Sequence, residues 1–267
     1  MVNKTPQWTA KKYLGQHFLV AEKIKAAIIA SCPSAADLIL EIGPGAGAIT
    51  DLLPALQKPI RAIEIDERFI PHLQELLGPE NVLAQDALKV DYSSLLKDFQ
   101  APWIVSNMPY NIAAPLMRIL LEQTKVAGIT LMMQKEMADK ILLPKKNGMN
   151  SLGILWHSFW QIEKICAVDP ACFRPRPKVD STVLFFTPKA DPLLPLAQIL
   201  SWENFLRQLF AFKRKQLSTV LSKMRNGPSK EQITQLLTDL KLDPHVRAEA
   251  LTIEQIKDLY QAWPKSL

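Results

Sequence analysis

Residues 107–110 read Asn-Met-Pro-Tyr and follow a short apolar run at 103–105. The run predicts a buried strand of a parallel sheet, and Asn107 then stands at its carboxyl end, where open α/β sheets bind ligands. Pro109 ends the strand and removes a backbone donor. An amide oxygen and a neighbouring carbonyl can accept both hydrogens of an exocyclic amine beside a stacking tyrosine. The alternative is an ordinary Asn-Pro turn.

A glycine-rich turn follows another apolar run upstream. Residues 38–42 predict a strand, residues 43–47 read Gly-Pro-Gly-Ala-Gly, and residues 48–53 predict a helix. Alternate glycines allow a tight turn and a close approach of a ligand to the backbone. With an acidic residue just before the first glycine, the spacing fits a loop that holds S-adenosylmethionine rather than a dinucleotide. A glycine turn without a ligand is the alternative.

Acidic residues occur at the ends of the next two predicted strands. Residues 61–66 carry Glu64, about 20 positions beyond the glycines, where a carboxylate commonly accepts ribose hydroxyls. A third strand ends at Asp86, which is suited to accept a hydrogen from an adenine amino group. Asp66 and Glu67 are interpreted instead as solvated carboxylates at a helix start. Four strand ends in a row thus carry ligand-type residues.

The elements that position these residues alternate along the chain. Strand-like and helix-like segments alternate from about residue 37 to 187, which implies βαβ units in a mostly parallel sheet. Beyond residue 188 the apolar spacing is helical only, and Ser229 and Thr252 are placed to cap helices. The helices predicted there cover residues 202–212, 217–224, 230–240 and 253–262. We therefore expect an α/β domain over residues 1–188 and a small all-helical domain over residues 189–267.

The basic charge is concentrated at the two ends of the sequence. Residues 1–25 hold five Lys and one Glu, and residues 189–267 hold twelve Lys or Arg against eight Asp or Glu. The middle holds fifteen basic and seventeen acidic residues, and the net charge of the whole chain is +6. Basic ends around a nearly neutral middle favour an enzyme that binds phosphates outside its active site. The alternative is a charged surface that only confers solubility.

Six blocks extend the pattern over nearly the whole chain. They are residues 12–19 (KYLGQHFL), 41–50 (EIGPGAGAIT), 85–88 (QDAL), 107–112 (NMPYNI), 173–181 (FRPRPKVDS) and 209–217 (LFAFKRKQL). On these blocks the chain resembles the ribosomal RNA adenine N6,N6-dimethyltransferase family, of the type that dimethylates two adjacent adenines near the 3′ end of 16S, small-subunit, rRNA. The combination is far more specific than any one block.

The resemblance implies a Rossmann-like methyltransferase domain that uses S-adenosyl-L-methionine and releases S-adenosyl-L-homocysteine. The residues that it implies for cofactor binding are His17, Leu19, Gly43, Gly45, Glu64, Asp86 and Asn107. The residues that it implies for catalysis are Asn107, Met108, Pro109, Tyr110 and Phe173. In this scheme Asn107 and the Met108 carbonyl orient the adenine N6, and Tyr110 and Phe173 flank the flipped base.

The same resemblance implies 16S rRNA within the small ribosomal subunit as partner, with the helical domain binding RNA or the ribosome. No metal is expected, because the sulfonium leaving group departs neutral. No run of about 18 apolar residues predicts a membrane span. The three cysteines form no Cys-x-x-Cys pair, so neither a zinc site nor a disulfide framework is expected. We expect a cytoplasmic monomer.

The chain departs from the family's pattern in two regions. Met108 and Ala113 stand where the family more often has Leu and Ser, but Met108 contributes only its backbone carbonyl. Residues 143–151 lack the Lys-x-Tyr-Gly type of sequence that is usual there. In the family this loop lies between the cofactor core and RNA, so the departure at 144–151 bears on local RNA contacts and on release of the monomethyl intermediate.

Three alternatives stay open. A large-subunit rRNA adenine methyltransferase of the antibiotic-resistance type shares the Asn-x-Pro-Tyr and Phe-x-Pro-x-Pro blocks, but the amino-terminal block and the helical tail argue against it. A non-catalytic ribosome-assembly factor would bind RNA only, which the intact amine motif disfavours. A small-molecule methyltransferase would leave the basic ends unexplained and would show no salt-dependent RNA affinity.

Overall fold

The computed structural model describes residues 9–11, 14–143, 148–225 and 227–264, which fall in two compact units. The first comprises Met1–Ala138 and Gln161–Pro188, and the second comprises Asp139–Trp160 and Lys189–Leu267. The chain passes from the first unit to the second after Pro188, which is also where the sequence predicted a division. The segment Asp139–Trp160, however, joins the second unit rather than the first. Its Ser158 Oγ accepts a hydrogen bond from Trp202 Nε1 at 2.9 Å, which ties this apolar helix to the tail.

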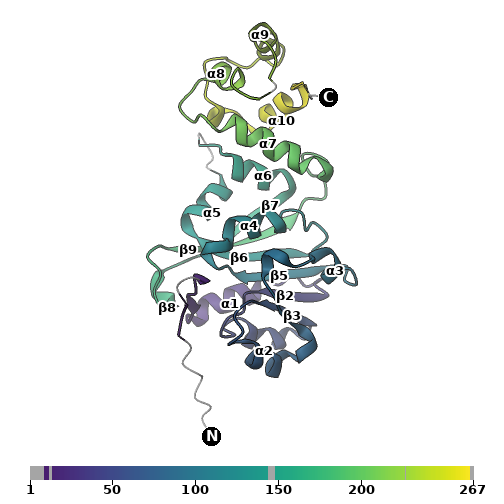
Figure 1. Ribbon diagram of the computed structural model, residues 1–267, viewed down its shortest axis with the longest axis vertical. Coiled ribbons are helices and arrows are strands. Elements are labelled where there is room, and N and C mark those ends of the chain that lie inside the picture. Colours follow the sequence, from purple (N-terminus) through teal and green to yellow (C-terminus); the bar gives the residue numbers. More distant parts are fainter. Residues whose placement is uncertain (1–8, 12–13, 144–147, 226, 265–267) are drawn as a thin grey trace. The chain divides into compact units, whose positions relative to one another are not determined.

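A seven-stranded sheet has the strand order β4-β3-β2-β5-β6-β9-β7 (Figure 1). Its strands are β2 (Leu38–Ile42), β3 (Ile60–Glu64), β4 (Val82–Ala84), β5 (Pro102–Asn107), β6 (Gly128–Gln134), β7 (Trp160–Val168) and β9 (Ser181–Pro188). The five from β4 to β6 are parallel, and β9 pairs antiparallel with β6. The predicted α/β class with a mostly parallel sheet is confirmed. A separate pair joins β1 (Phe18–Leu19) to β8 (Phe173–Arg174).

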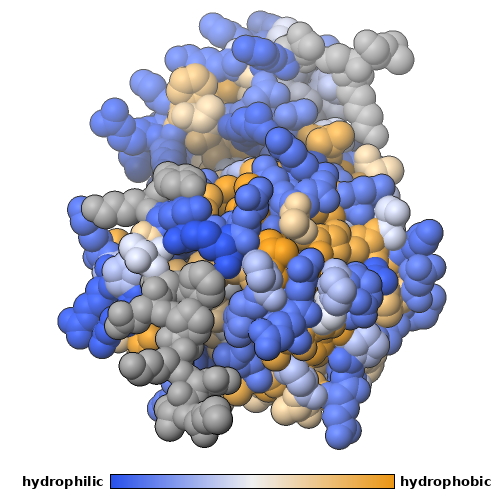
Figure 2. All heavy atoms as spheres, turned by 60° about the horizontal axis from the view of Figure 1, so that its bottom comes forward, coloured by the Kyte–Doolittle hydropathy of each residue, from blue (hydrophilic) through white to orange (hydrophobic). Residues whose placement is uncertain are grey.

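The strands follow from the apolar runs. Every residue of β2 is buried, as expected for a central parallel strand with both faces covered. The parallel direction brings the carboxyl ends of β4, β3, β2 and β5 to one edge. A core cluster that includes Ile39, Trp103 and Phe173 packs against the sheet. On the face shown in Figure 2, hydrophilic residues predominate, and apolar residues are visible between them near the centre.

The helices connect the strands of the first unit. They are α1 (Glu22–Ala30), α2 (Ile70–Leu77), α3 (Tyr92–Leu96), α4 (Ala113–Leu120), α5 (Lys135–Leu142) and α6 (Ser151–Phe159). The boundary between the units falls within α5, after Ala138, and α6 belongs to the second unit. The helix predicted over residues 48–53 begins two residues later than expected and is a 3₁₀ helix, η2 (Thr50–Leu56). Pro54 lies inside it, and a proline can neither donate the α-helical hydrogen bond nor fit its ring against the preceding turn.

The carboxyl-terminal segment contains the four predicted helices. They are α7 (Ile199–Leu209), α8 (Leu217–Leu221), α9 (Lys230–Asp239) and α10 (Ile253–Ala262). Capping boxes form at Ser229 with Gln232 and at Thr252 with Gln255, as predicted. Among the helices that the structure describes, none is long and apolar enough to cross a bilayer. Part of the atypical loop, residues 144–147, lies outside the described residues.

Candidate active site

A cavity opens at the carboxyl edge of the sheet in the first unit. The predicted site residues that line it are His17, Leu19, Gly43, Gly45, Glu64, Asp86, Asn107, Met108, Pro109 and Tyr110. They come from the amino-terminal segment and from the ends of β2, β3, β4 and β5. The structure therefore brings together every predicted site residue except Phe173.

The glycine turn forms one wall of the cavity. Gly43 and Gly45 have φ angles of 69° and 56°, a left-handed conformation that favours glycine. A Cβ atom added to Gly45 would lie 3.6 Å from the Phe18 ring. The Gly45 N–H donates to Glu64 Oε2 at 2.8 Å, so the turn also orients the acid on the next strand.

Glu64 is the acid at the end of β3, and its side chain is oriented by backbone donors. Oε1 accepts from the N–H groups of Ile65 and Asp66 at 2.9 and 2.8 Å, while Oε2 accepts from Gly45. Burial raises the pKa of Glu64, and these hydrogen bonds oppose the rise. Three donors occupy three of about four acceptor positions on a carboxylate. Binding both ribose hydroxyls would therefore require a backbone donor to share or move.

Glu41 is a second acid that lines the cavity. It was not among the predicted cofactor-binding or catalytic residues. It is 2% exposed and accepts a hydrogen bond from Thr50 Oγ1 at 2.7 Å. Burial, reinforced by the charges of Glu64 and Asp51, raises the pKa of Glu41 to about 8. Its position just before the glycines was the available signal.

Asp86 follows β4 and lines the cavity at the next strand end. Its Oδ1 accepts from Leu88 N at 3.0 Å and caps the short helix η4 (Ala87–Lys89). This cap fixes the carboxyl group at the cavity wall and uses one oxygen. A carboxylate held in this way keeps acceptor capacity for an amino group.

Asn107 is the last residue of β5, and its amide group has a defined orientation. Asn107 Nδ2 donates to the His17 carbonyl at 3.1 Å. Since a carbonyl oxygen only accepts, the amide nitrogen must face His17, and Oδ1 is the atom left to accept from a ligand. The Met108 N–H donates to the Met132 carbonyl at 3.1 Å, which extends the β5 to β6 pairing to the next peptide.

Tyr110 and His17 form the aromatic part of the cavity wall. Their ring centroids are 5.5 Å apart with an interplanar angle of 32°. The Tyr110 hydroxyl shares a 2.7 Å hydrogen bond with Ser181 Oγ at the start of β9. His17 Nδ1 lies 2.8 Å from the Pro175 carbonyl and must donate to it. Burial raises the pKa of Tyr110, so the phenol is neutral at physiological pH.

Phe173 does not line the cavity. It is 0% exposed, belongs to the core cluster and pairs with Leu19 across β1 and β8. In this arrangement it presents no face to a base, and its contribution is to support the strand that carries Leu19. Without the family resemblance, a phenylalanine at this position is interpreted as an ordinary core residue, and the structure places Phe173 in the core.

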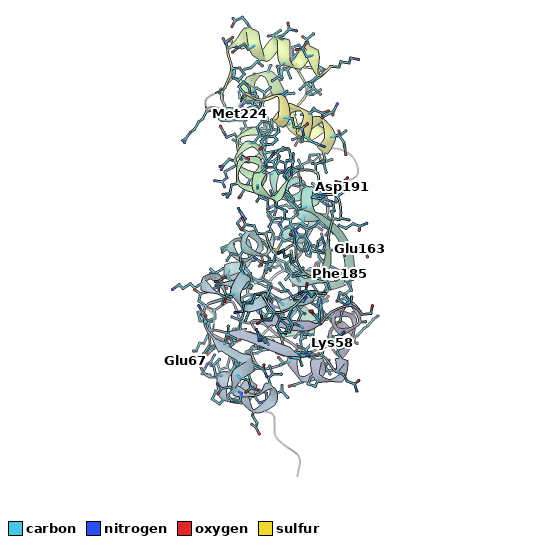
Figure 3. The ribbon with its side chains drawn as sticks, turned by 90° about the vertical axis from the view of Figure 1, so that its right-hand side faces the viewer. Lys58, Glu67, Glu163, Phe185, Asp191 and Met224 are labelled. Atoms are coloured by element: carbon cyan, nitrogen blue, oxygen red, sulfur yellow. The ribbon has the colours of Figure 1, made fainter. Side chains whose placement is uncertain are left out.

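The interpretation of Asp66 as a solvated carboxylate is wrong. Asp66 is 2% exposed, whereas its neighbour Glu67 is exposed (Figure 3). Gln16 Nε2 donates to Asp66 Oδ2 at 2.9 Å across 50 residues of sequence. Gln16 also lines the cavity. Nothing in the local pattern could have indicated either role, since the contact depends on the tertiary structure.

The parallel sheet, the glycine turn and the acids at successive strand ends define the class: an S-adenosylmethionine-dependent methyltransferase. The profile of the family "Ribosomal RNA adenine dimethylase" matches residues 7–265. The chain belongs to this family.

Individual relatives agree with the family match. The ribosomal RNA small subunit methyltransferase A of Bacillus thuringiensis (strain Al Hakam) is 33% identical over 264 residues, which cover 94% of this chain and 90% of the relative. The crystal structure of a dimethyladenosine transferase from Plasmodium falciparum has a TM-score of 0.76 at 27% identity, covering 91% and 96% of the two chains. The 23S rRNA methyltransferase ErmE shares the fold, with a TM-score of 0.70 at 24% identity and coverage of 91% and 98%.

Proposed function

We propose that this enzyme transfers methyl groups from S-adenosylmethionine to N6 of two adjacent adenines near the 3′ end of 16S rRNA, giving N6,N6-dimethyladenosine. The observation that carries the proposal is the orientation of Asn107. Its amide nitrogen is engaged by the His17 carbonyl, and its oxygen remains available at the cavity that also contains Glu64 and Asp86. One cavity thus contains both an acceptor for the target amine and the strand-end acids suited to bind the cofactor.

The cofactor fits the polar groups of the cavity. Glu64 is the acceptor for ribose hydroxyls and Asp86 is the acceptor for the adenine amino group, while Gly43 and Gly45 leave room for the methionine part. His17 and Leu19 complete the wall from the amino-terminal side. When bound, the cofactor supplies an electrophilic methyl group on a sulfonium and departs as a neutral thioether. No metal is required for this chemistry.

The amine motif activates N6 through geometry. The lone pair of an adenine amine is delocalised into the ring, so the nitrogen must be drawn towards a tetrahedral arrangement. Asn107 Oδ1 and the Met108 carbonyl accept one N6 hydrogen each. Pro109 follows directly, so the peptide that carries the Met108 carbonyl has no N–H of its own. The displaced N6 proton leaves to solvent after the transfer.

Tyr110 stacks on the flipped base and fixes its plane. The hydrogen bond between its hydroxyl and Ser181 holds the ring in position, and the neighbouring His17 ring limits its movement. Phe173, buried in the core, supports Leu19 in place of stacking on the base. Phe173 therefore has a structural role in place of the base-flanking role that the family resemblance implied.

RNA binding is assigned to the basic ends of the chain. Residues 189–267 are the RNA- or ribosome-binding region, joined in the second unit by the helix α6. The substrate is 16S rRNA within the small ribosomal subunit, and the enzyme acts as a monomer in the cytoplasm. A steep loss of RNA affinity with salt follows from phosphate contacts by Lys and Arg.

The proposal is tested with labelled S-adenosylmethionine and small subunits that lack adenine dimethylation. Large subunits are treated in parallel, and the RNA is digested for identification of labelled nucleosides by mass. Label in N6,N6-dimethyladenosine from the small subunit alone is the expected result. Label in large-subunit RNA would instead favour a large-subunit rRNA adenine methyltransferase. Tight, salt-sensitive subunit binding without any transfer would identify an assembly factor.

A further inference from the structure

Asp66 lies two residues beyond Glu64, and its carboxyl group is 0% exposed. Arg68 Nε donates to its Oδ1 at 2.9 Å, and Lys11 Nζ forms an ion pair with Oδ1 at 3.1 Å. Gln16 Nε2 donates to Oδ2 at 2.9 Å. The hydrogen bond from Arg68, with those from Gln16 and Lys11, holds the pKa of Asp66 well below its ordinary value. The carboxylate is therefore charged throughout the physiological range.

The same cluster binds the amino-terminal segment through its backbone. Lys11 N donates to Gln16 Oε1 at 2.8 Å, and Arg68 Nη1 donates to the Thr9 carbonyl at 2.9 Å. Thr9, Lys11 and Gln16 are thus attached to Asp66 and Arg68. The bonds from Arg68 to the Thr9 carbonyl and from Gln16 to Asp66 are charge-assisted, and such bonds are stronger than neutral ones.

The amino-terminal segment contacts the amine motif immediately afterwards. A Cβ atom added to Gly15 would lie 3.0 Å from Asn111 Oδ1, so the segment passes close to the loop after Tyr110. The His17 carbonyl accepts from Asn107 Nδ2. Residues 15–17 therefore join the acidic end of β3 to the residues that would hold the adenine amine.

We infer that Asp66 is a positioning residue which, through Gln16, holds residues 15–17 across the cavity and keeps the cofactor side and the amine side in register. Asp66 is not among the residues that line the cavity, so it acts through Gln16 rather than by touching a ligand. The inference concerning the amine side rests on the proposed function. The inference concerning the cofactor side does not, because it is measurable without RNA.

The test compares Asp66→Asn with Asp37→Asn as a matched control. Asp37 also anchors a loop in the first unit, accepting from the N–H groups of Gln100 and Ala101 at 2.6 and 3.0 Å, and it does not line the cavity. Binding of S-adenosylhomocysteine is measured by isothermal titration calorimetry. We expect Asp66→Asn to weaken binding at least about tenfold more than Asp37→Asn, because small displacements of positioning groups are costly.

A swap of donor and acceptor separates positioning from general loss of structure. In the double variant Asp66→Asn with Gln16→Glu, the amide at 66 donates to a carboxylate at 16, which keeps the hydrogen bond and one negative charge for Arg68. Partial recovery of cofactor affinity relative to Asp66→Asn is expected, with a coupling term that a double-mutant cycle reports. Failure of the double variant to recover any affinity would overturn the inference.

Two further outcomes are decisive. Equal losses in Asp66→Asn and Asp37→Asn would also overturn the inference. If Asp66→Asn does not fold, Arg68→Gln replaces it, since the Arg68 side chain is 31% exposed. A loss of S-adenosylhomocysteine affinity in that variant supports the inference, and unchanged affinity contradicts it. A failure of the proposed function would show as absent methyl transfer by the wild type and would leave these binding measurements intact.

Discussion

The cofactor side of the cavity and the amine side are held by different kinds of contact. On the cofactor side, Glu64 accepts from Ile65, Asp66 and Gly45, the farthest of which is 19 residues away. On the amine side, Asn107 donates a hydrogen bond to the carbonyl of His17, 90 residues away. The Tyr110 hydroxyl shares a hydrogen bond with the hydroxyl of Ser181, 71 residues away. The amine side therefore depends on contacts with distant segments, while the orientation of Glu64 on the cofactor side is fixed by its own strand end and the preceding glycine turn.

The largest expected effect comes from Asn107→Ala on the amine side. Loss of the oriented acceptor should lower kcat for methyl transfer on the order of 10²-fold or more, by analogy with removal of one oriented polar group from an active site. Single-turnover transfer to undermethylated small subunits measures it. S-adenosylhomocysteine affinity serves as the control and should fall far less. Near wild-type turnover would show that Asn107 does not orient the amine.

The corresponding change on the cofactor side is Glu64→Gln. An amide oxygen cannot serve all three backbone donors and a ribose, so binding should weaken roughly 10- to 100-fold, as expected when a buried group loses charge-assisted partners. Titration calorimetry with S-adenosylhomocysteine measures the loss. Unchanged affinity would remove Glu64 from the cofactor site.

Glu41, which lines the cofactor side of the cavity, should make the stability of the fold depend on pH. Burial raises its pKa from an ordinary 4.5 to about 8, so between these values the folded protein keeps a proton that the unfolded chain has lost. Stability should therefore fall as pH rises, by about 2 kcal/mol between pH 6 and pH 8. Urea unfolding at both pH values measures the change. The Glu41→Gln variant should lack this part of the pH dependence, and an identical pH dependence in both proteins would contradict the assignment.

The smallest effect is expected for Tyr110→Phe, which keeps the ring and removes the hydrogen bond to Ser181. A neutral hydrogen bond contributes roughly 1 kcal/mol, so kcat/KM for RNA should fall by up to about tenfold. Ser181→Ala is the matched variant, and the two changes should be non-additive because they remove the same contact. Additive losses would mean that the hydroxyl acts elsewhere.

The difference between the two sides also explains what the sequence could predict. The strands β2 and β5, the glycine turn and the caps at Ser229 and Thr252 depend on nearby residues, and all were predicted. The helix predicted at 48–53 forms instead as a 3₁₀ helix over Thr50–Leu56, which contains Pro54.

The local sequence pattern could not predict contacts between segments that are far apart in the chain. The burial of Asp66 could not be inferred, since it depends on a segment far away in the chain. The burial of Phe173 is what a phenylalanine suggests by itself, and only the family resemblance placed it at a base. For the same reason the roles of Gln16 and Ser181 emerged only from the structure. The residues that the resemblance implied, apart from Phe173, line one cavity, and only the structure shows the contacts that orient them.

The division of the cavity is tested most directly by methyl transfer to undermethylated small subunits at increasing S-adenosylmethionine concentration, with Glu64→Gln and Asn107→Ala side by side. The account predicts that high cofactor concentration restores transfer by Glu64→Gln and leaves Asn107→Ala defective. Restoration of both variants, or of neither, would contradict the assignment of one side to the cofactor and the other to the adenine amine.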